Sequence, residues 1–290
     1  MRSQHEIRQE ITNQIVQSLK NGVVPWRKPW KTLSGPSSPT NFLTRKRYLG
    51  INIPLLWLTS SQKGYEVDFW GTYRQWELNG AFPKKGEKAT QIVFWKPVQK
   101  MGLDADGNRV TSSFPILRTF NVFNIHQVSG GGIEQQLSLE PAASFEHEKR
   151  SRFQEAVSAT GAKIIYGGGV ASYRPSTDLI NMPDEDRFDS FPAFADTLLH
   201  ELAHWTEPRL KWAGSYAEGE LRAEMSAAFS TAALGIHAPI DQSAAYISGW
   251  LKALQDDSRV LLRASSAASK ASDFILSFSR SADEAAIQEA

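Results

Sequence analysis

The segment His200-Glu-Leu-Ala-His204 constrains the fold more than any other part of this 290-residue chain. Two histidines four residues apart lie on one face of an α-helix, so both imidazoles can reach a single metal ion. Glu201, beside the first histidine, can accept a proton from a water molecule bound to that ion. The spacing therefore predicts a helix that carries a metal centre, with Glu201 in the catalytic role.

The flanking residues predict where this helix begins and ends. Ser190 is a suitable N-cap, and Pro192 is tolerated in a first turn. Pro208 disrupts a helix interior, so the helix should stop close to it. Between these limits the apolar residues recur at helical spacing: they are Phe194, Leu198, Leu199, Leu202 and Trp205.

A site with two histidines needs a third ligand, and the next predicted helix offers two carboxylates. Ser215 and Glu218 form a capping box at its start, and the alanine-rich segment runs to about Gly235. Glu220 and Glu224 are four residues apart and share one face of this helix.

Glu224 is the predicted third ligand, because it follows His204 by twenty residues, a spacing found in zinc peptidases with a glutamate ligand on a downstream helix. Glu220 would then support the ligands, or it is the alternative ligand. Glu207 is a weaker alternative, because its helix is expected to end at Pro208. We expect one zinc ion per chain, with another divalent transition metal as the alternative, and water in the fourth position.

The composition excludes several other kinds of site. The chain contains no cysteine, which excludes disulfides, thiol nucleophiles and zinc sites built on cysteine. It has no apolar run of eighteen residues, so no membrane-spanning helix is expected. The N-terminal residues lack the apolar region of a signal peptide. A cytoplasmic protein without a membrane partner is therefore the expectation.

The net charge of +1 conceals two halves of opposite charge. Residues 1–130 contain 18 Lys and Arg against 8 Asp and Glu, whereas the remainder contains 14 against 23. The tract Ser129-Gly-Gly-Gly132 and the polar residues after it are typical of a linker. The sequence thus predicts an α+β chain with a small basic domain at 1–130, a linker at 131–145 and a metal-binding domain at 146–290.

The basic half combines cations with aromatic residues, and six of the nine tryptophans lie in it. Cations follow the phosphates of single-stranded DNA, and exposed rings stack on its unpaired bases. Trp57, Trp70 and Trp76 are instead expected in the core. The predicted DNA-binding residues are Trp26, Arg27, Lys28, Trp30, Arg45, Lys46, Arg47, Tyr48, Lys84, Lys85 and Lys88.

Two ordered sets of segments carry a family resemblance. They are Pro25–Trp30, Arg47–Asn52, Lys85–Lys88, Val93–Trp95 and Phe120–Asn124 in the first half, and Tyr173–Asp178, Ile180–Pro183 and His200–Trp205 in the second. The first set resembles the N-terminal domain of ArdC-type antirestriction proteins, which is also similar to the N-terminal part of some plasmid-encoded primases. The second set resembles the zincin-type metallopeptidase domain of the same proteins.

This resemblance implies a protein that binds single-stranded DNA and shields incoming plasmid DNA from host restriction. It also implies metal roles for His200, His204 and Glu224 and a catalytic role for Glu201. In zincin folds an edge strand above the metal helix binds extended peptide, and Ala171–Tyr173 with Leu179–Met182 are the predicted strand pair. No residue stands out as the oxyanion donor of a peptidase, for which the candidates are Tyr216 and Tyr246.

Three classes of function are consistent with the sequence. The first is a DNA-binding antirestriction protein, with single-stranded DNA as its partner and duplex DNA bound more weakly. The second is an active metallopeptidase that the basic domain brings to DNA, where it cleaves a DNA-bound or regulatory host protein. The third, a metallonuclease, ranks last because nucleases gather several carboxylates around magnesium ions. We predict the first of these functions and keep the active metallopeptidase as the alternative.

Overall fold

The computed structural model describes residues 3–27, 36, 38–103, 109–133, 146–237 and 244–288. Within these ranges helices and strands are mixed along the whole chain, which confirms the predicted α+β class. None of the helices in the described ranges is both long enough and apolar enough to cross a membrane.

The described part of the first half contains helices and two groups of paired strands. Strands β1, β2, β5 and β4 form one sheet in that order, and β3 pairs with β6. The elements are α1 (Gln4–Lys20), β1 (Thr40–Asn41), α2 (Asn52–Lys63), β2 (Phe69–Gly71), α3 (Tyr73–Leu78), β3 (Ala81–Pro83), β4 (Thr90–Leu103), β5 (Arg109–Asn124), the 3-10 turn Ile125–Gln127 and β6 (Val128–Gly130).

The second half is mainly helical and carries a small sheet. Its strand order is β7-β9-β8, so β8 is an edge strand, paired antiparallel with β9 as predicted. The elements are α5 (Glu146–Ala159), β7 (Lys163–Tyr166), β8 (Ser172–Arg174), β9 (Leu179–Met182), the 3-10 turn Glu185–Arg187, α6 (Phe191–Arg209), α7 (Tyr216–Ala233), α8 (Ala244–Asp256) and α9 (Arg259–Gln288).

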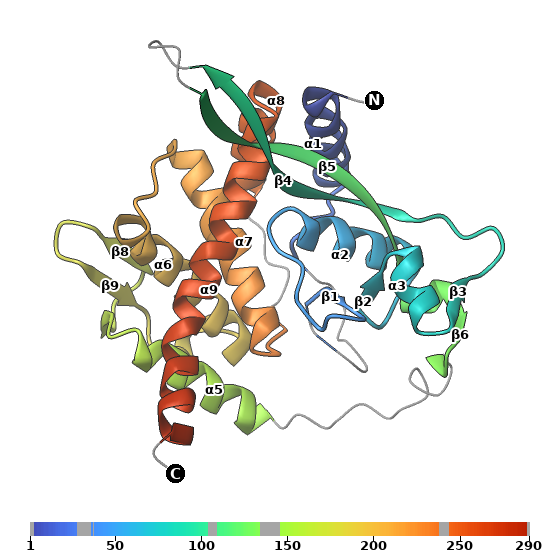
Figure 1. Ribbon diagram of the computed structural model, residues 1–290. Helices are drawn as coiled ribbons and strands as arrows, with labels where there is room; N and C mark the ends of the chain where they lie inside the picture. The colour runs from blue at the N-terminus through green and yellow to red at the C-terminus, as the bar shows by residue number, and fades with distance from the viewer. Residues whose placement is uncertain are drawn as a thin grey trace.

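Helix α9 runs through the centre of the molecule, with α6 and the small sheet on one side and α2, α3 and the short strands β1, β2, β3 and β6 on the other, while α7 crosses behind it (Figure 1). Strands β4 and β5 form a long two-stranded ribbon that projects beyond the other strands of its sheet (Figure 1). The residues that join the two strands, 104–108, lie outside the described residues.

The basic and acidic halves share one hydrophobic core. Ile11 and Ile15 on α1 and Trp57 on α2 belong to the same buried cluster as Phe229 on α7 and Trp250 on α8. The rings of Trp57 and Phe229 lie 6.0 Å apart between centroids. Burial of apolar surface therefore joins the two halves of the chain, although their net charges have opposite signs.

The predicted boundaries at 130 and 146 remain a prediction. Residues 134–145, which make up most of the proposed linker, lie outside the described residues. A second buried cluster belongs to the acidic half alone and packs α6 against α5, α9 and the small sheet. This cluster holds the predicted metal helix in place.

Candidate metal centre

Helix α6 has the ends that its sequence predicts. The hydroxyl of Ser190 accepts a hydrogen bond from the N–H of Ala193, and the helix ends at Arg209, one residue after Pro208. Leu198, Leu199 and Leu202 are buried on its inner side. This anchoring fixes the opposite side of the helix, on which the two histidines lie.

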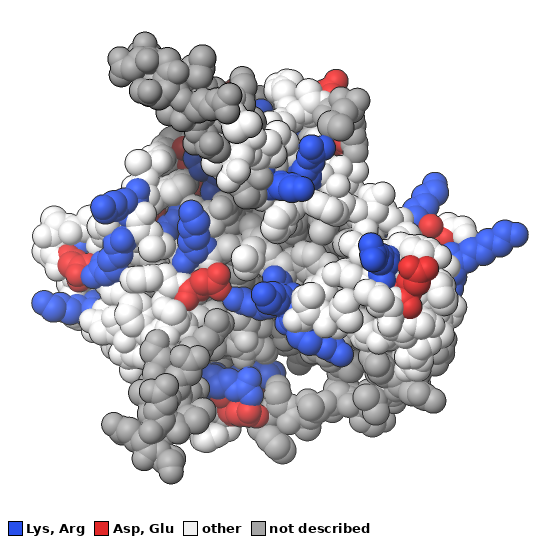
Figure 2. Space-filling model, in the orientation of Figure 1, with Lys and Arg blue, Asp and Glu red and all other residues white. Residues whose placement is uncertain are grey.

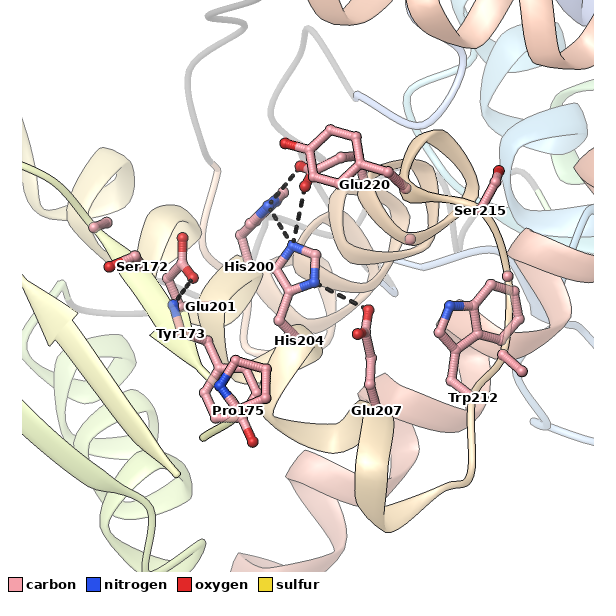
Figure 3. A pocket seen from close by; sticks show the side chains of 15 residues that line it. Ser172, Tyr173, Pro175, His200, Glu201, His204, Glu207, Trp212, Ser215 and Glu220 are labelled. Atoms are coloured by element: carbon pink, nitrogen blue, oxygen red, sulfur yellow. Dashed lines mark hydrogen bonds and ion pairs between the residues drawn. The ribbon is translucent and has the colours of Figure 1, made fainter. Parts of the chain in front are cut away.

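His200 and His204 direct the same ring nitrogen to a common point (Figure 3). Their Nε2 atoms are 3.2 Å apart. Both side chains are partly exposed, at 21% and 18%, so solvent and ligands can reach them. Two imidazole nitrogens at this separation form half of a tetrahedral donor set for a transition metal.

Glu220 on α7 is the carboxylate that meets these histidines. Its Oε2 lies 3.5 Å from Nε2 of His200, and its Oε1 lies 3.7 Å from Nε2 of His204. One ligand atom from each of the three residues falls within 4.8 Å of the others. The donor set of two nitrogens and one carboxylate fits a divalent transition metal and leaves a coordination position for water.

Glu224, the glutamate favoured from the sequence spacing, points to a different partner. Its Oε2 lies 2.5 Å from Nη2 of Arg27, and it does not belong to the cluster formed by the two histidines and Glu220. Four residues advance a helix by about 6 Å, so two glutamates on one face cannot occupy the same position opposite His200. The structure therefore favours the alternative ligand, Glu220.

Arg27 joins the two helices of the site from the N-terminal half. Its Nη1 lies 2.6 Å from Oδ1 of Asp196, one turn before His200, while its Nη2 pairs with Glu224, one turn after Glu220. Burial alone lowers the pKa of the Arg27 guanidinium, but the two carboxylates outweigh it and raise the pKa overall. Arg27 thus remains charged and bridges α6 and α7 beside the metal cluster.

Glu207 forms a hydrogen bond with the other ring nitrogen of His204. Its Oε1 lies 3.0 Å from Nδ1, and Nη1 of Arg222 lies 3.6 Å from the same oxygen. A carboxylate that accepts a hydrogen bond from Nδ1–H leaves the Nε2 lone pair free for a metal and fixes the ring orientation. Burial lowers the pKa of Arg222 to about 10, in part opposed by Glu207.

His200 and Glu220 each stabilise the charged form of the other. Burial alone lowers the pKa of His200, but its hydrogen bond with Glu220 and the carboxylates of Glu224 and Glu201 raise the pKa overall. Burial alone raises the pKa of Glu220, but its hydrogen bond with His200 and the charge of His204 lower it overall. Each of the two groups therefore favours the charged form of the other.

Glu201 lies on the side of the site nearest to the edge strand. Its Oε2 accepts a hydrogen bond of 2.7 Å from the backbone N–H of Tyr173 on β8, and the side chain is buried (Figure 3). A cavity of about 480 Å³ opens beside it, lined by residues of β8, α6, the loop 212–215 and the start of α7. The edge strand, the glutamate and the histidines thus face one common space.

Tyr216 also lines this cavity, and its hydroxyl donates a hydrogen bond to Glu220. The ring is 77% exposed, so it can move toward a bound molecule. The side chain of Tyr246, the other candidate oxyanion donor, lies outside the described residues.

Two of the predicted DNA-binding residues are buried instead. Trp26 is 0% exposed and packs edge-on against Trp250, with ring centroids 5.4 Å apart, and Arg27 is 8% exposed in its ion pairs. Both were predicted to contact DNA, which requires exposure, but partners far along the chain cover them. Lys28 and Trp30 lie outside the described residues.

The other predicted cations lie at or near the surface. Arg45 is exposed, and its guanidinium lies 4.8 Å and 4.7 Å from the ring centroids of Phe42 and Phe69, whereas Arg47 pairs with Asp273 on α9. Tyr48 is partly buried and accepts a hydrogen bond from the side-chain amide of Asn41. The side chains that remain exposed are Lys46, Lys84, Lys85 and Lys88.

The sequence did not predict that Glu207 orients His204, that Arg222 lies beside Glu207, or that the N–H of Tyr173 binds Glu201. Glu207 has a local signal, because it follows His204 by three residues and can reach its ring across one helical turn. Arg222 and the N–H of Tyr173 have no such signal, because they approach the site through tertiary packing.

Comparison with known proteins identifies two family domains. Residues 5–123 match the N-terminal domain of anti-restriction factor ArdC, and residues 151–267 match a zincin-like metallopeptidase. A metal-free crystal structure of the antirestriction protein ArdC from plasmid R388 superposes with a TM-score of 0.78 at 33% identity, over 94% of this chain and 98% of that chain. A Mn(II)-bound structure of the same protein superposes with a TM-score of 0.71 at 32% identity, over 94% of this chain and 97% of that chain.

Sequence relatives agree with this result. An uncharacterized protein of Sinorhizobium fredii, y4eC, is 32% identical over 93% of this chain and 91% of its own length. The DNA primase TraC of Escherichia coli is 36% identical over 93% of this chain, but the chain spans only 27% of that primase. The two domain matches, the solved structures and the full-length relative together show that this chain belongs to the ArdC-like antirestriction family, with a zincin-like metallopeptidase domain.

Proposed function

We propose that the chain binds single-stranded DNA and protects incoming plasmid DNA from host restriction in the cytoplasm. The observation that carries this proposal is its similarity to the antirestriction protein ArdC along nearly the whole length of both chains. The excess of ten positive charges in residues 1–130 supports it, because such a surface attracts phosphates. Duplex DNA, whose bases cannot stack on protein rings, would bind more weakly.

The test of DNA binding uses the full chain, because the two halves share a core. Affinities for a single-stranded oligonucleotide and its duplex are measured at several salt concentrations. Changing Lys84, Lys85 and Lys88 together to Gln should reduce the salt slope for single strands by about two, since each phosphate contact contributes about 0.7.

A matched control removes three exposed lysines from the acidic half. Lys163, Lys211 and Lys252 are also exposed, and their change to Gln alters the net charge by the same amount. If this control lost as much affinity as the first variant, binding would depend on total charge rather than on the predicted surface.

We also propose that the site holds one zinc ion through His200, His204 and Glu220. Zinc is the proposed metal because imidazole and carboxylate donors in a four-coordinate site suit it well. Metal analysis of the purified protein should find about one equivalent, which His204→Ala or Glu220→Gln should remove. Glu224→Gln should keep the metal, and a loss of metal in this variant alone would assign the third ligand to Glu224.

The second candidate function is an active peptidase. The specific observation in its favour is the open cavity beside Glu201 and the edge strand β8. When bound, a metal ion would polarise a peptide carbonyl and lower the pKa of its water ligand. Glu201 would accept the proton from that water, β8 would align an extended peptide by backbone hydrogen bonds, and Tyr216 would donate to the carbonyl oxygen.

The variant Glu201→Gln separates the two functions. It should retain the metal and DNA binding, because Glu201 belongs to neither the proposed ligand set nor the basic surface. Cleavage of DNA-bound host proteins, followed by mass spectrometry, should disappear in this variant. Cleavage that persists at the wild-type rate would remove Glu201 from the chemistry, and protection of DNA by Glu201→Gln would show that antirestriction does not need proteolysis.

A further inference from the structure

The ribbon of β4 and β5 has an unusual composition for a solvent-exposed sheet. Its 30 residues include four Lys and Arg but neither Asp nor Glu. Large apolar side chains are also exposed on it, and none of them was among the predicted DNA-binding residues. Basic side chains predominate over acidic ones on the face of the molecule that Figure 2 shows.

The strand register separates the two faces of the ribbon. Phe94 lies opposite Arg118, and Ile92 lies opposite Phe120, so these four side chains share one face. Lys96, two residues after Phe94, projects from the same face. We call this surface the ribbon platform; it is formed by Phe94, Lys96, Arg118 and Phe120.

The other face of the ribbon has a structural role. Val93 and Leu117 project from it and are buried in the core that the two halves share. Trp95 also lies on this face, because it is directly opposite Leu117. The core thus accounts for Val93 and Leu117, whereas Trp95 is 43% exposed on this face, as the rings of the ribbon platform are on the other.

The ribbon platform continues a buried part of the same face into solvent. Next to its inner end, Ile92 is 7% exposed and packs in a cluster with Val122 and, more loosely, Tyr48. Further along, Phe94 is 61% exposed and Phe120 is 46% exposed. Their rings lie 6.4 Å apart between centroids at an angle of 85°, so each ring leaves much of its surface to solvent.

We propose that the ribbon platform is a stacking surface for the bases of single-stranded DNA. Bases would stack on Phe94 and Phe120, while the cations of Arg118 and Lys96 lie within reach of the phosphates. The absence of acidic residues from both strands favours a polyanion over an apolar protein partner. The proposal rests on the proposed single-strand binding and gives it a location.

Tyr48 connects this surface with the cations predicted from the sequence. It packs against the cluster that contains Ile92 and Val122, and exposed Lys46 precedes it by two residues. A strand of DNA that leaves the inner end of the ribbon platform would therefore meet the loop of Arg45 and Lys46.

The test compares binding of an oligothymidylate by the full chain and by Phe94→Ala/Phe120→Ala. Because each stacked base contributes about 1–3 kcal/mol, we expect the double variant to bind at least about tenfold more weakly. Duplex affinity should change little, since paired bases do not stack on these rings. The variant Phe94→Tyr/Phe120→Tyr keeps both rings and should restore wild-type affinity.

Two control variants test whether binding depends on the ribbon platform or on exposed aromatic residues in general. Phe82 on β3 has the same exposed fraction as Phe120, 46%, and Phe82→Ala should leave affinity unchanged. Trp95→Phe alters the opposite face of the same strand and should also have little effect. Circular dichroism and thermal unfolding of the double variant should match those of the wild type, because neither ring is buried.

The outcomes distinguish failure of this inference from failure of the proposed function. A wild-type chain that binds no single strands would overturn both. A wild-type chain that binds, together with a folded Phe94→Ala/Phe120→Ala variant of equal affinity, would overturn the ribbon platform alone. Equal losses in Phe82→Ala and the double variant would do the same, because stacking would then not be localised to the ribbon.

Discussion

Replacing Arg27 with Met should destabilise the protein strongly, although Arg27 lies outside the metal cluster. Its side chain is 6% exposed, and Asp196 and Glu224 are each 14% exposed, so solvent screens these ion pairs little. Removing one partner from a buried ion pair costs about 3–5 kcal/mol, because the remaining charge stays buried and unpaired. Here two carboxylates would lose the same cation.

The loss should appear as a lower thermal midpoint and a lower free energy of unfolding in denaturant. For a chain of this size, about 2–4 °C per kcal/mol corresponds to a decrease of about 6–20 °C. Asp196→Asn and Glu224→Gln, added to Arg27→Met, should recover part of this loss because they remove both buried charges.

A matched control is Arg45→Met, because Arg45 is an exposed cation that lies over the rings of Phe42 and Phe69. An exposed cation–π contact contributes about 0.5–1 kcal/mol, so this variant should remain close to the wild type. If Arg27→Met were no less stable than Arg45→Met, the bridge between α6 and α7 would not be an important source of stability.

Two further predictions concern the metal cluster. Glu207→Gln should weaken metal binding about 10- to 100-fold in competition titrations, because it disturbs the carboxylate that orients His204; unchanged affinity would contradict this role. In chelator-treated protein, the pKa of His200 is raised from 6.5 and the pKa of Glu220 is lowered from 4.5, so their pair stabilises the fold fully between pH 4.5 and 6.5. Stability relative to Glu220→Gln should therefore fall as the pH rises through the folded pKa of His200, and a difference independent of pH in denaturant titrations would refute the pairing.

Local signals were sufficient to predict the elements that carry the site. The cap at Ser190, the capping box of Ser215 with Glu218 and the spacing of His200 and His204 act within a few residues of each other. Helices with such signals begin where the sequence indicates, because the hydrogen bonds of their ends are satisfied locally.

The choice between Glu220 and Glu224 could not be made in this way. Both glutamates lie on one face of α7, and only the position of α7 along α6 determines which one meets the histidines. That position depends on contacts such as the one between Arg27 and Glu224, which are 197 residues apart in the chain. Trp26 illustrates the same limit, because Trp250 covers a ring that was predicted to be exposed for contact with DNA.

The shared core has a consequence for how such chains recombine. Where related chains exchange segments between residues 130 and 146, the first half of one would have to fit α7 and α8 of another. Trp57 against Phe229 and Trp26 against Trp250 are contacts that a foreign partner would have to reproduce. Exchange at this point would therefore select for compatible partners, and the two family domains should be inherited together as one cassette, including within longer chains such as the primases.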